Sequence, residues 1–338
     1  MTGRLVSIPE MLAPALATMT PVAPMRIAVH DALGVAPVAD ILTPRALPAG
    51  NIALRGGHAV AALDLVGASP HSPVMLSKMP ARVSAGDTLP EGSDAVLPPE
   101  GLVDEGVFVE VSRAVAPGDG VRLTGQDLAA DALLIPAGMP LVARHLLVLA
   151  LAGIETVETR VPLVHLPVGA KPETAWLATS CRALGCRIAA PDEKADLALG
   201  WSDAQGPVLA LNPGDSGQLR LAAGAPPTIL LPRRFDGTIA AFVALALPLI
   251  ERLGDRRATI ESRPLTRKIA SNVGIAEIVL LRSVPEGYRP LAIGEITLAA
   301  LAAADHIALV PPESEGAAAG SVLAAWPLEL SPPCQALS

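Results

Sequence analysis

The chain has 338 residues, a formal net charge of −8 and an aromatic content of only 2%. This length is sufficient for two or three domains, and aliphatic side chains must fill their cores because aromatic residues are scarce. The acidic balance excludes broad binding to nucleic acids, which requires a concentrated basic surface. The three cysteines, Cys181, Cys186 and Cys334, fit neither a disulfide framework nor a zinc site, so we expect reduced cytoplasmic thiols.

No segment is predicted to be a secretory signal or a membrane span. The first residues lack the charged-then-apolar order of a signal, and Pro9 and Pro14 interrupt the apolar stretch after them. The apolar runs over 141–154 and 238–250 are too short to span a bilayer. We therefore expect a soluble, cytoplasmic protein that binds neither a membrane nor nucleic acid.

The first half of the chain predicts a short helix followed by many short strands. A helix is expected over 7–19, with Ser7 as its N-cap and Glu10 as the capping-box partner. From residue 40 to about 115, short apolar runs separated by Gly and Pro predict a small β-rich domain. A second helix is predicted over 142–152.

The second half predicts an α/β region followed by a β-rich one. Residues 161–168 are expected to form a buried strand, and the strands and helices that alternate after it indicate a parallel sheet. The expected helices cover 174–184 and 238–253, and the expected strands cover 186–189, 197–200, 208–211 and 228–231. Beyond Gly254, four more strands are predicted over 261–268, 275–281, 288–292 and 322–326.

The segment 85–97, with the sequence A-G-D-T-L-P-E-G-S-D-A-V-L, is the most informative motif. Together with Glu100 it resembles the pattern T-G-A-x-L-P-x-G-A-D-A-V-V, then E, of the molybdopterin molybdenumtransferase family. These MoeA and gephyrin-type enzymes insert molybdate into the molybdenum cofactor. Further resemblances occur in the same order at 117–127 and 294–311, so the resemblance extends over about residues 8–328.

The resemblance implies a multidomain α/β plus β protein with an elongated MoeA-like architecture. Its parts would be a β-rich N-terminal half, a shortened three-layer α/β domain of the molybdopterin-binding type and a C-terminal β-barrel-like domain. The implied boundaries are 1–39 and 116–160 for domain I (linker and dimerisation), 40–115 for the small β-rich domain II, 161–256 for the α/β domain III, 257–330 for the barrel-like domain IV, and 331–338 for a tail.

In this family, adenylated molybdopterin and molybdate bind in a cleft between the α/β domain of one subunit and the elongated domain of its dimer partner. Such anions require glycine-rich turns, helix N-termini and well-placed Lys or Arg side chains. The resemblance carries ten cofactor-binding candidates to this chain: Asn51, Arg55, Gly56, Asp94, Lys171, Ser202, Pro213, Gly214, Arg233 and Arg234. It assigns no catalytic residue and no metal ligand.

Several candidates depart from the family's motifs, and each has a structural alternative. Arg55 replaces a carboxylate, which reverses the local charge, and is either an anion contact or a solvated turn residue. Lys171 lies where the family has T-G-D-E-L. It is either an anion contact or an exposed, solvated charge. Trp201 replaces open glycine backbone and either stacks on a ligand ring or caps the core.

The pair Arg233 and Arg234 is the strongest anion-site candidate, because a predicted helix begins directly after it and helix N-termini offer free N–H groups. The loop over 211–217 resembles the family's M-K-P-G-K-P, with both lysines lost. We interpret Glu277 as structural.

Two functions are compatible with these residues. The first is a MoeA-like protein of molybdenum cofactor biosynthesis, which binds a molybdopterin nucleotide and molybdate with Mg²⁺ and inserts the metal as a transferase. The second is a catalytically inactive paralogue, whose homodimer is a scaffold for a molybdoenzyme or another cofactor-assembly protein. The altered acidic and glycine-rich loops favour the second. Arg55→Asp would separate the two, because a restored carboxylate matters only at a working ligand site.

Overall fold

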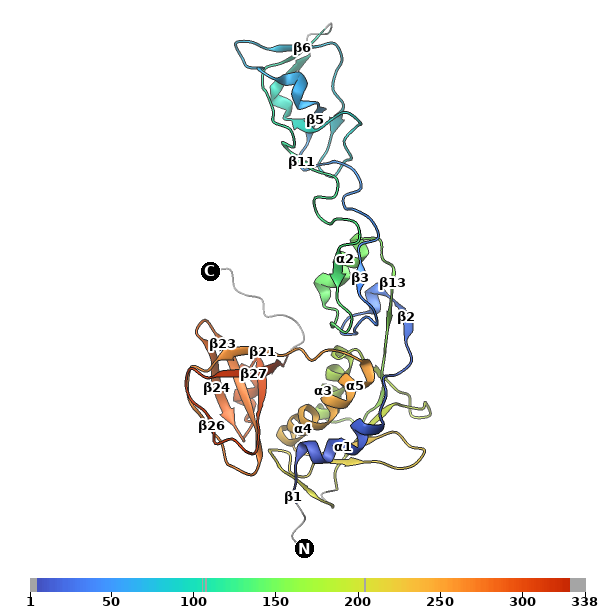
Figure 1. Cartoon of the computed structure of the whole chain (residues 1–338), viewed down its shortest axis with the longest axis vertical. Coiled ribbons are helices and arrows are strands. Elements are labelled where there is room, and N and C mark those ends of the chain that lie inside the picture. Colours follow the sequence, from blue (N-terminus) through green and yellow to red (C-terminus); the bar gives the residue numbers. More distant parts are fainter. Residues whose placement is uncertain (1–4, 105, 107, 204, 329–338) are drawn as a thin grey trace. The chain divides into compact units, whose positions relative to one another are not determined.

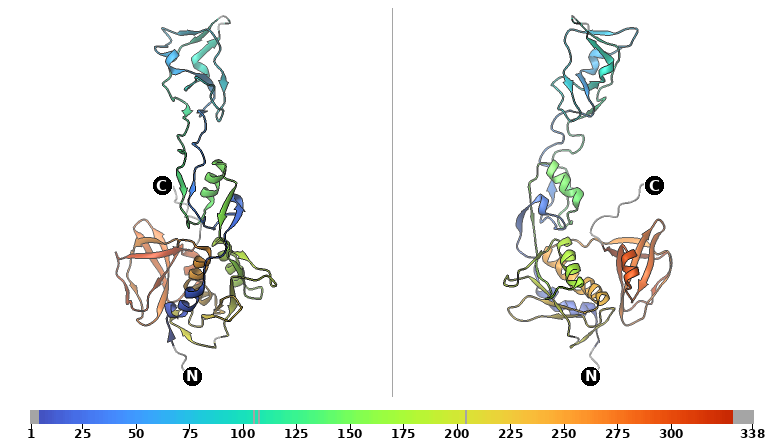
Figure 2. Two further views of the ribbon diagram at one scale, coloured as in Figure 1. Left: turned by 45° about the vertical axis from the view of Figure 1, so that its right-hand side comes forward. Right: turned by 180° about the vertical axis from the view of Figure 1, so that it is seen from behind.

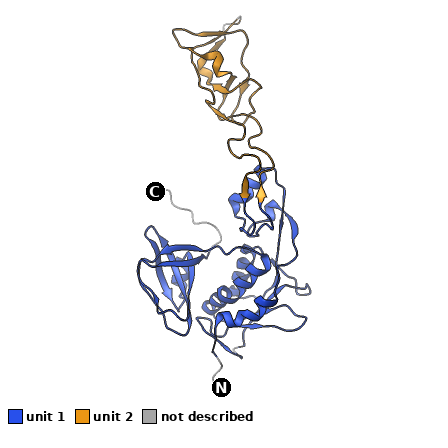
Figure 3. Ribbon diagram, viewed as in Figure 1, with its two compact units in different colours: residues 1–40, 135–338 blue, residues 41–134 orange. Residues whose placement is uncertain are grey.

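The computed structural model describes residues 5–104, 106, 108–203 and 205–328, which form two compact units (Figure 3). Unit 1 contains Met1–Asp40 and Ile135–Ser338, and unit 2 is Ile41–Leu134. This division is coarser than the four predicted domains, whose boundaries remain predictions. The predicted tail over 331–338 lies outside the described residues, and so does Cys334.

Unit 2 consists of short strands and two 3₁₀ turns, consistent with the Gly- and Pro-rich sequence. In its two three-stranded sheets, β5 lies between β7 and β8, and β10 lies between β6 and β9. The apolar run that begins at Val60 is not one strand, because β5 ends there and a 3₁₀ turn comes next. The elements are β3 (Ile41–Leu42), β4 (Ile52–Ala53), β5 (Gly57–Val60), the turn Ala62–Leu65, β6 (Val74–Leu76), β7 (Arg82–Val83), β8 (Ala95–Leu97), the turn Pro99–Gly101, β9 (Leu102–Asp104), β10 (Val109–Val111) and β11 (Val121–Arg122).

A five-stranded sheet forms the centre of the α/β part of unit 1. Its order is β15-β14-β16-β20-β19, and only β19 is antiparallel to its neighbour, which confirms the predicted parallel pairing. The strands are β14 (Leu163–His165), β15 (Arg187–Ile188), β16 (Leu197–Trp201), β19 (Gln218–Arg220) and β20 (Thr228–Leu231). The buried strand predicted over 161–168 is shorter than expected, because Pro162 and Pro167 flank it, and Val168 is 93% exposed.

Helices pack with this sheet into one core that includes Leu12, Leu177 and Leu245. They are α1 (Ile8–Thr18), α3 (Pro172–Ala183), α4 (Phe235–Ala241) and α5 (Leu247–Gly254). Ser7 caps α1 as predicted, because its hydroxyl accepts a hydrogen bond from the Glu10 N–H at 3.3 Å. Figures 1 and 2 show α1 beside α5, which it contacts. Cys181 and Cys186 are buried and free, and burial raises the pKa of Cys181 to about 12.

One continuous helix runs from Phe235 to Gly254, through α4, a π-helical segment (Phe242–Ala246) and α5. The wide π turns precede Pro248, whose missing N–H and bulky ring disturb regular α-helical bonding. This helix is longer than predicted, so the expectation that its apolar run is too short for a membrane span was wrong. It is nevertheless a core helix, because 83% of its most apolar window is buried.

The C-terminal part of unit 1 is a six-stranded sheet of order β18-β23-β25-β27-β21, with β24 also paired to β23. Its elements are β18 (Leu211–Asn212), β21 (Glu261–Pro264), β23 (Ala276–Val284), β24 (Gly287–Ile293), α6 (Leu298–Ala303), β25 (His306–Val310) and β27 (Val322–Pro327), with β22 (Ile269–Ala270) and β26 (Gly316–Ala317) paired beside it. Because β18 pairs in parallel with β23, Asn212 lies next to Glu277. This pairing connects the α/β part to the C-terminal sheet.

Seven further elements complete the description of unit 1. Strand β1 (Leu5–Val6) pairs in parallel with β17 (Val208–Leu209), and β2 (Met25–Ala28) pairs antiparallel with β13 (Thr156–Thr159). The 3₁₀ turn Val29–Asp31 comes after β2, and helix α2 (Ala143–Leu151) precedes β13. Strand β12 (Leu133–Ile135) lies where the chain passes from unit 2 back into unit 1.

Candidate functional site

A cavity of about 590 Å³ in unit 1 collects half of the predicted site residues. Those five are Ser202, Pro213, Gly214, Arg233 and Arg234. The loops after β18 and β20 supply most of them, and the C-terminal sheet contributes Glu277 and Gly294 to the opposite wall. The parallel pairing of β18 with β23 brings these walls together. We call this space the carboxylate cavity, because acidic side chains outnumber basic ones in its lining.

Gly214 allows the chain to turn tightly at the wall of this cavity. Its φ of +127° lies where L side chains are strained, and an added Cβ would be 2.8 Å from Leu211 Cδ2. The position therefore requires glycine for the fold, whether or not a ligand approaches its backbone.

Asp236 occupies the start of the long helix, which was predicted to be free for an anion. Its carboxylate accepts a hydrogen bond from the Gly237 N–H at 2.7 Å, and it is only 3% exposed. It also forms an ion pair with Arg234, whose Nε donates to Asp236 Oδ1 at 3.1 Å. An acidic side chain in the first turn is favourable there. The protein's own carboxylate therefore occupies part of this helix start, and an anion role for Arg233 and Arg234 remains a prediction.

Glu277 is the most extensively bonded carboxylate of the cavity. Its oxygens accept hydrogen bonds from Asn212 Nδ2 at 3.1 Å, Ser271 Oγ at 2.7 Å and the Asn272 N–H at 3.1 Å. Burial alone would raise the pKa of Glu277, but the hydrogen bonds from Ser271, Asn212 and Asn272 outweigh it and lower the pKa. The side chain is therefore held as a carboxylate, in agreement with its interpretation as structural.

The lining of the carboxylate cavity has more acidic than basic groups. Its charged residues are Arg233, Arg234, Asp215, Asp236, Glu277 and Glu295. Arg234 is paired with Asp236, and Arg233 makes no hydrogen bond or ion pair with any described residue. A molybdopterin nucleotide and molybdate are both anions, so this lining does not fit them. In the described part of the chain, no group of three or more His, Cys, Asp or Glu residues is arranged to hold a metal ion.

Lys171 does not line this cavity and contacts Trp201 instead. Its Nζ is 5.2 Å from the centre of the Trp201 ring, a cation–π geometry. The indole N–H of Trp201 donates to the Val168 carbonyl at 3.2 Å, and its ring packs against the core of the α/β part. Trp201 thus caps the edge of the core, which is the structural alternative for this residue.

The other four candidates lie in unit 2, where three of them bond to neighbouring groups. Asn51 Oδ1 accepts from the Thr124 N–H at 3.0 Å, and Asp94 Oδ1 accepts from the Ala62 N–H at 2.7 Å. Arg55 pairs with Asp119 at 2.9 Å and donates to the Val96 carbonyl at 3.1 Å. Gly56 lies in the turn before β5. These contacts account for Asn51, Arg55 and Asp94 structurally, and a ligand role for the four remains a prediction.

Comparison with known proteins relates the N-terminal part of the chain to a family. A model of the MoeA N-terminal region (domain I and II) matches residues 6–153. A Methanocaldococcus jannaschii protein named as a molybdopterin biosynthesis protein is 31% identical over 128 residues, which are 35% of this chain and 32% of that protein. Molybdopterin molybdenumtransferase 2 of Mycobacterium tuberculosis is 30% identical over 133 residues, 34% of this chain and 33% of that enzyme. The N-terminal part of the chain, residues 6–153, belongs to the MoeA family.

The matches cover about a third of the length of these curated relatives. Solved structures extend the likeness in fold. The molybdopterin biosynthesis moeA protein of Pyrococcus horikoshii OT3 superimposes with a TM-score of 0.67 at 19% identity, over 95% of this chain and 99% of that one. A molybdenum cofactor biosynthesis protein of Pyrococcus furiosus gives 0.58 at 13% identity over 95% and 99%. The MoeA-like fold inferred from the motifs is thereby confirmed.

Sequence reasoning did not predict that several residues of the carboxylate cavity lie together. Asp236 was detectable, because an acidic residue in the first turn of a helix is a common N-terminal signal. Asn212 and Glu277 are 65 positions apart, and no local pattern indicates that β18 and β23 pair. Glu295 and Gly294 were likewise recognised only as parts of the motif over 294–311.

Glu277→Gln is expected to lower the stability of the protein at pH 7 by about 1–2 kcal/mol. It should also make the free energy of unfolding depend less on pH in the acid range. A lowered folded-state pKa contributes stability above the ordinary value of 4.5, and that stability is lost as the pH falls through the folded-state pKa. Urea midpoints measured from pH 6 to pH 3 should fall less steeply for the variant than for the parent. Glu286→Gln, at an exposed site, is the control; equal slopes for Glu277→Gln and the parent would contradict the prediction.

Arg55→Asp is expected to destabilise unit 2 by about 1–2 kcal/mol rather than restore a ligand site. The change removes a half-exposed ion pair worth at most about 1 kcal/mol, leaves the Val96 carbonyl without its donor, and places two carboxylates near each other. Arg122→Asp is the matched control, because Arg122 and Asp127 form a similarly exposed pair at 3.3 Å. Thermal unfolding should show the larger loss of stability for Arg55→Asp. Equal losses in the two variants would show that the hydrogen bond from Arg55 to the Val96 carbonyl adds nothing to stability.

Proposed function

We propose that this protein takes part in molybdenum cofactor biosynthesis without inserting molybdate itself. In this proposal it is a dimeric, cytoplasmic scaffold for a molybdoenzyme or another cofactor-assembly protein. The relatives named for molybdopterin biosynthesis and molybdenum transfer support the pathway. The excess of acidic side chains in the carboxylate cavity supports the proposal that the protein does not insert molybdate.

A single observation carries the non-catalytic part of the proposal. Two of the three arginines that would contact an anionic cofactor are already paired inside the chain, Arg55 with Asp119 and Arg234 with Asp236. Releasing either arginine to a ligand would break its pair and leave a carboxylate facing the anion. Catalysis on a molybdopterin nucleotide needs preorganised positive groups, and most of the positive charge here is committed elsewhere.

A scaffold needs a surface that a partner covers, and helix α2 offers one. Leu147 and Leu151 lie one helical turn apart and are 62% and 70% exposed. Two large apolar side chains on the same helical face favour a protein partner, and a second copy of the chain is the simplest one. We therefore infer that α2 belongs to a dimer interface.

Arg233 favours a second candidate function, the binding of a molybdopterin nucleotide without turnover. Among the described residues it has no partner, although it lines the carboxylate cavity. A divalent cation such as Mg²⁺ would have to offset the surrounding carboxylates before an anion could bind there.

A direct titration tests the proposed function. The purified protein is titrated with adenylated molybdopterin, with and without molybdate and Mg²⁺, by calorimetry, and the M. tuberculosis molybdopterin molybdenumtransferase 2 serves as the control. We expect no binding at concentrations that saturate the control protein, and no rescue of a bacterial strain that lacks molybdenum insertion. Rescue of that strain would overturn the proposal; Mg²⁺-dependent binding without rescue would select the second candidate.

The double variant Leu147→Glu, Leu151→Glu is expected to convert the dimer into a monomer. Two charges buried in an apolar interface without partners weaken association by several kcal/mol. Light scattering coupled to size-exclusion chromatography measures the mass of the particle. Leu63→Glu is the control, because Leu63 is 82% exposed on unit 2. A dimer that persists in the double variant, or a parent that is already monomeric, would rule out α2 as the interface.

A further inference from the structure

Two other cavities of unit 1 meet at Arg256. One, which we call the aromatic cavity, measures about 440 Å³ and lies between α3, the long helix and strand β27. The other, the basic cavity, measures about 470 Å³ and lies beside the segment that leads into α2. Both are lined by Ala183, Arg256, Thr259 and Pro327. Neither shares a lining residue with the carboxylate cavity, so they form a separate place on the protein.

The end of the long helix directs Arg256 into this junction. Asp255 adopts a left-handed conformation with φ +47°, which reverses the chain after Gly254, and the Arg256 N–H donates to the Glu251 carbonyl at 3.1 Å. Arg256 is only 9% exposed, and its guanidinium donates to the Leu184 carbonyl at 2.7 Å. Its Nε is buried and has no hydrogen-bond partner among the described residues. A buried N–H of a charged group without an acceptor is costly, so the guanidinium is not fully compensated by the protein itself.

The two cavities differ in chemistry on either side of Arg256. The aromatic cavity is lined by Trp176, Phe242 and Trp326, and the first two rings meet edge to face at 5.3 Å. The basic cavity adds Arg144 and Arg257. One end of the combined space thus favours a flat apolar group, and the other favours negative charge.

The acidic groups near Arg256 compensate its charge only in part, through the charge of Glu251 in the aromatic cavity. No described carboxylate forms an ion pair with Arg256, and burial raises the pKa of the nearby Glu251 while it lowers that of Arg256 itself. Glu261, the acidic residue of the basic cavity, is bonded to His306 Nε2 at 3.3 Å. The guanidinium therefore lies in a poorly hydrated environment, where a bound anion would interact with it strongly.

We propose that the joined cavities bind a small organic anion that carries a flat apolar ring system. Its acidic group would accept a hydrogen bond from the Arg256 guanidinium, and its ring would lie among Trp176, Phe242 and Trp326. This site is independent of molybdenum chemistry and would be retained whether or not the protein binds a molybdopterin nucleotide.

A matched pair of fluorescent probes tests this proposal. 1-Anilinonaphthalene-8-sulfonate has a flat ring system and a sulfonate, and N-phenyl-1-naphthylamine is its uncharged counterpart. We expect the native protein to bind the sulfonate at least tenfold more tightly than the amine. Arg256→Met should weaken the binding of the sulfonate about tenfold or more and change the binding of the amine less than twofold. Arg267→Met, at an exposed site that lines none of these cavities, should change neither.

A measurement on the unaltered protein covers the possibility that Arg256→Met does not fold. The arginine Nε–H signals are followed by ¹⁵N nuclear magnetic resonance during titration with the sulfonate, and the Arg256 signal is assigned with Arg256→Lys. It should shift and saturate with the dissociation constant found by fluorescence. Equal affinity for the two probes, or an Arg256 signal that stays in place while the sulfonate binds, would overturn the proposal.

Discussion

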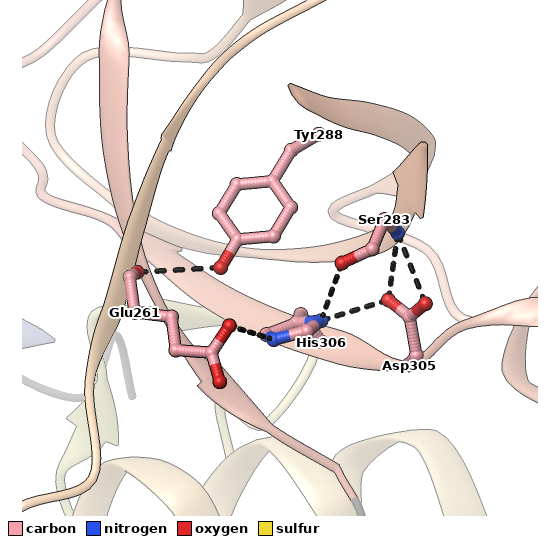
Figure 4. Close-up of polar contacts among 5 residues, drawn as sticks. All are labelled: Glu261, Ser283, Tyr288, Asp305 and His306. Atoms are coloured by element: carbon pink, nitrogen blue, oxygen red, sulfur yellow. Dashed lines mark hydrogen bonds and ion pairs between the residues drawn. The ribbon is translucent and has the colours of Figure 1, made fainter. Parts of the chain in front are cut away.

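Replacing His306 with alanine is expected to lower the free energy of unfolding of the C-terminal sheet by about 3 kcal/mol. His306 is 1% exposed and lies between two carboxylates, with Nδ1 2.8 Å from Asp305 Oδ1 and Nε2 3.3 Å from Glu261 Oε2 (Figure 4). Nδ1 is also 3.3 Å from Ser283 Oγ, and the ring packs on Tyr288 with 4.9 Å between centroids. Alanine removes all these contacts and leaves a void inside the sheet.

The effect is measurable because Trp326 reports on this sheet. Trp326 pairs with Ile307, next to the histidine, and a background with Trp176→Phe and Trp201→Phe leaves it as the sole tryptophan. Its fluorescence during urea unfolding gives the local stability. His306→Phe keeps a ring against Tyr288 but removes the hydrogen bonds, so it should lose about 1–2 kcal/mol. If the alanine variant unfolds at the same urea concentration as an exposed His71→Ala control, the histidine contributes nothing.

Asp236→Ala is expected to destabilise the protein by about 2 kcal/mol and, at the same time, to create an anion site. The carboxylate now bonds the Gly237 N–H and Arg234 at the start of the long helix. Its removal leaves helix N–H groups without a partner, which costs about 1–2 kcal/mol, and the loss of the buried ion-paired charge adds to this. The freed N–H groups and Arg234 then resemble the anion sites found at other helix N-termini.

Phosphate provides the test of the second effect. Added phosphate should raise the melting temperature of Asp236→Ala more than that of the parent, because a ligand that binds only the folded state stabilises it. Asp215→Ala is the control, since it removes another negative charge from the same cavity without opening the helix. A phosphate response in the parent as large as that of the variant would show that the native cavity already binds anions, and would weaken the proposed function.

Local patterns predicted the elements well where a single segment decides the outcome. Ser7 caps its helix, and the strand over 228–231 has the observed limits, because capping and apolar periodicity act over a few residues. The motif over 85–97 indicated the family for a similar reason. The tight turns of unit 2 require its Gly and Pro residues at fixed positions.

The chemistry of the site was harder to predict, because charges are paired through space. Arg55 and Arg234 looked like free positive groups in sequence, and only the fold shows that Asp119 and Asp236 neutralise them. Asp236 is two residues from Arg234, yet its orientation depends on burial in the helix start. Arg256 gave no sequence signal at all, because its environment is assembled from segments far apart in the chain.

The pairing of β1 with β17 has a consequence for how the protein is made. Leu5 aligns with Val208, so the first strand has no partner until about 200 more residues have been translated. At typical rates of synthesis this delay is on the order of 10–40 s. All of unit 2 emerges within that interval and can fold from its own contacts, whereas the amino-terminal segment must wait. A nascent chain of this protein therefore spends much of its synthesis with one finished module and an unpaired leading strand, a state in which a chaperone would be most useful.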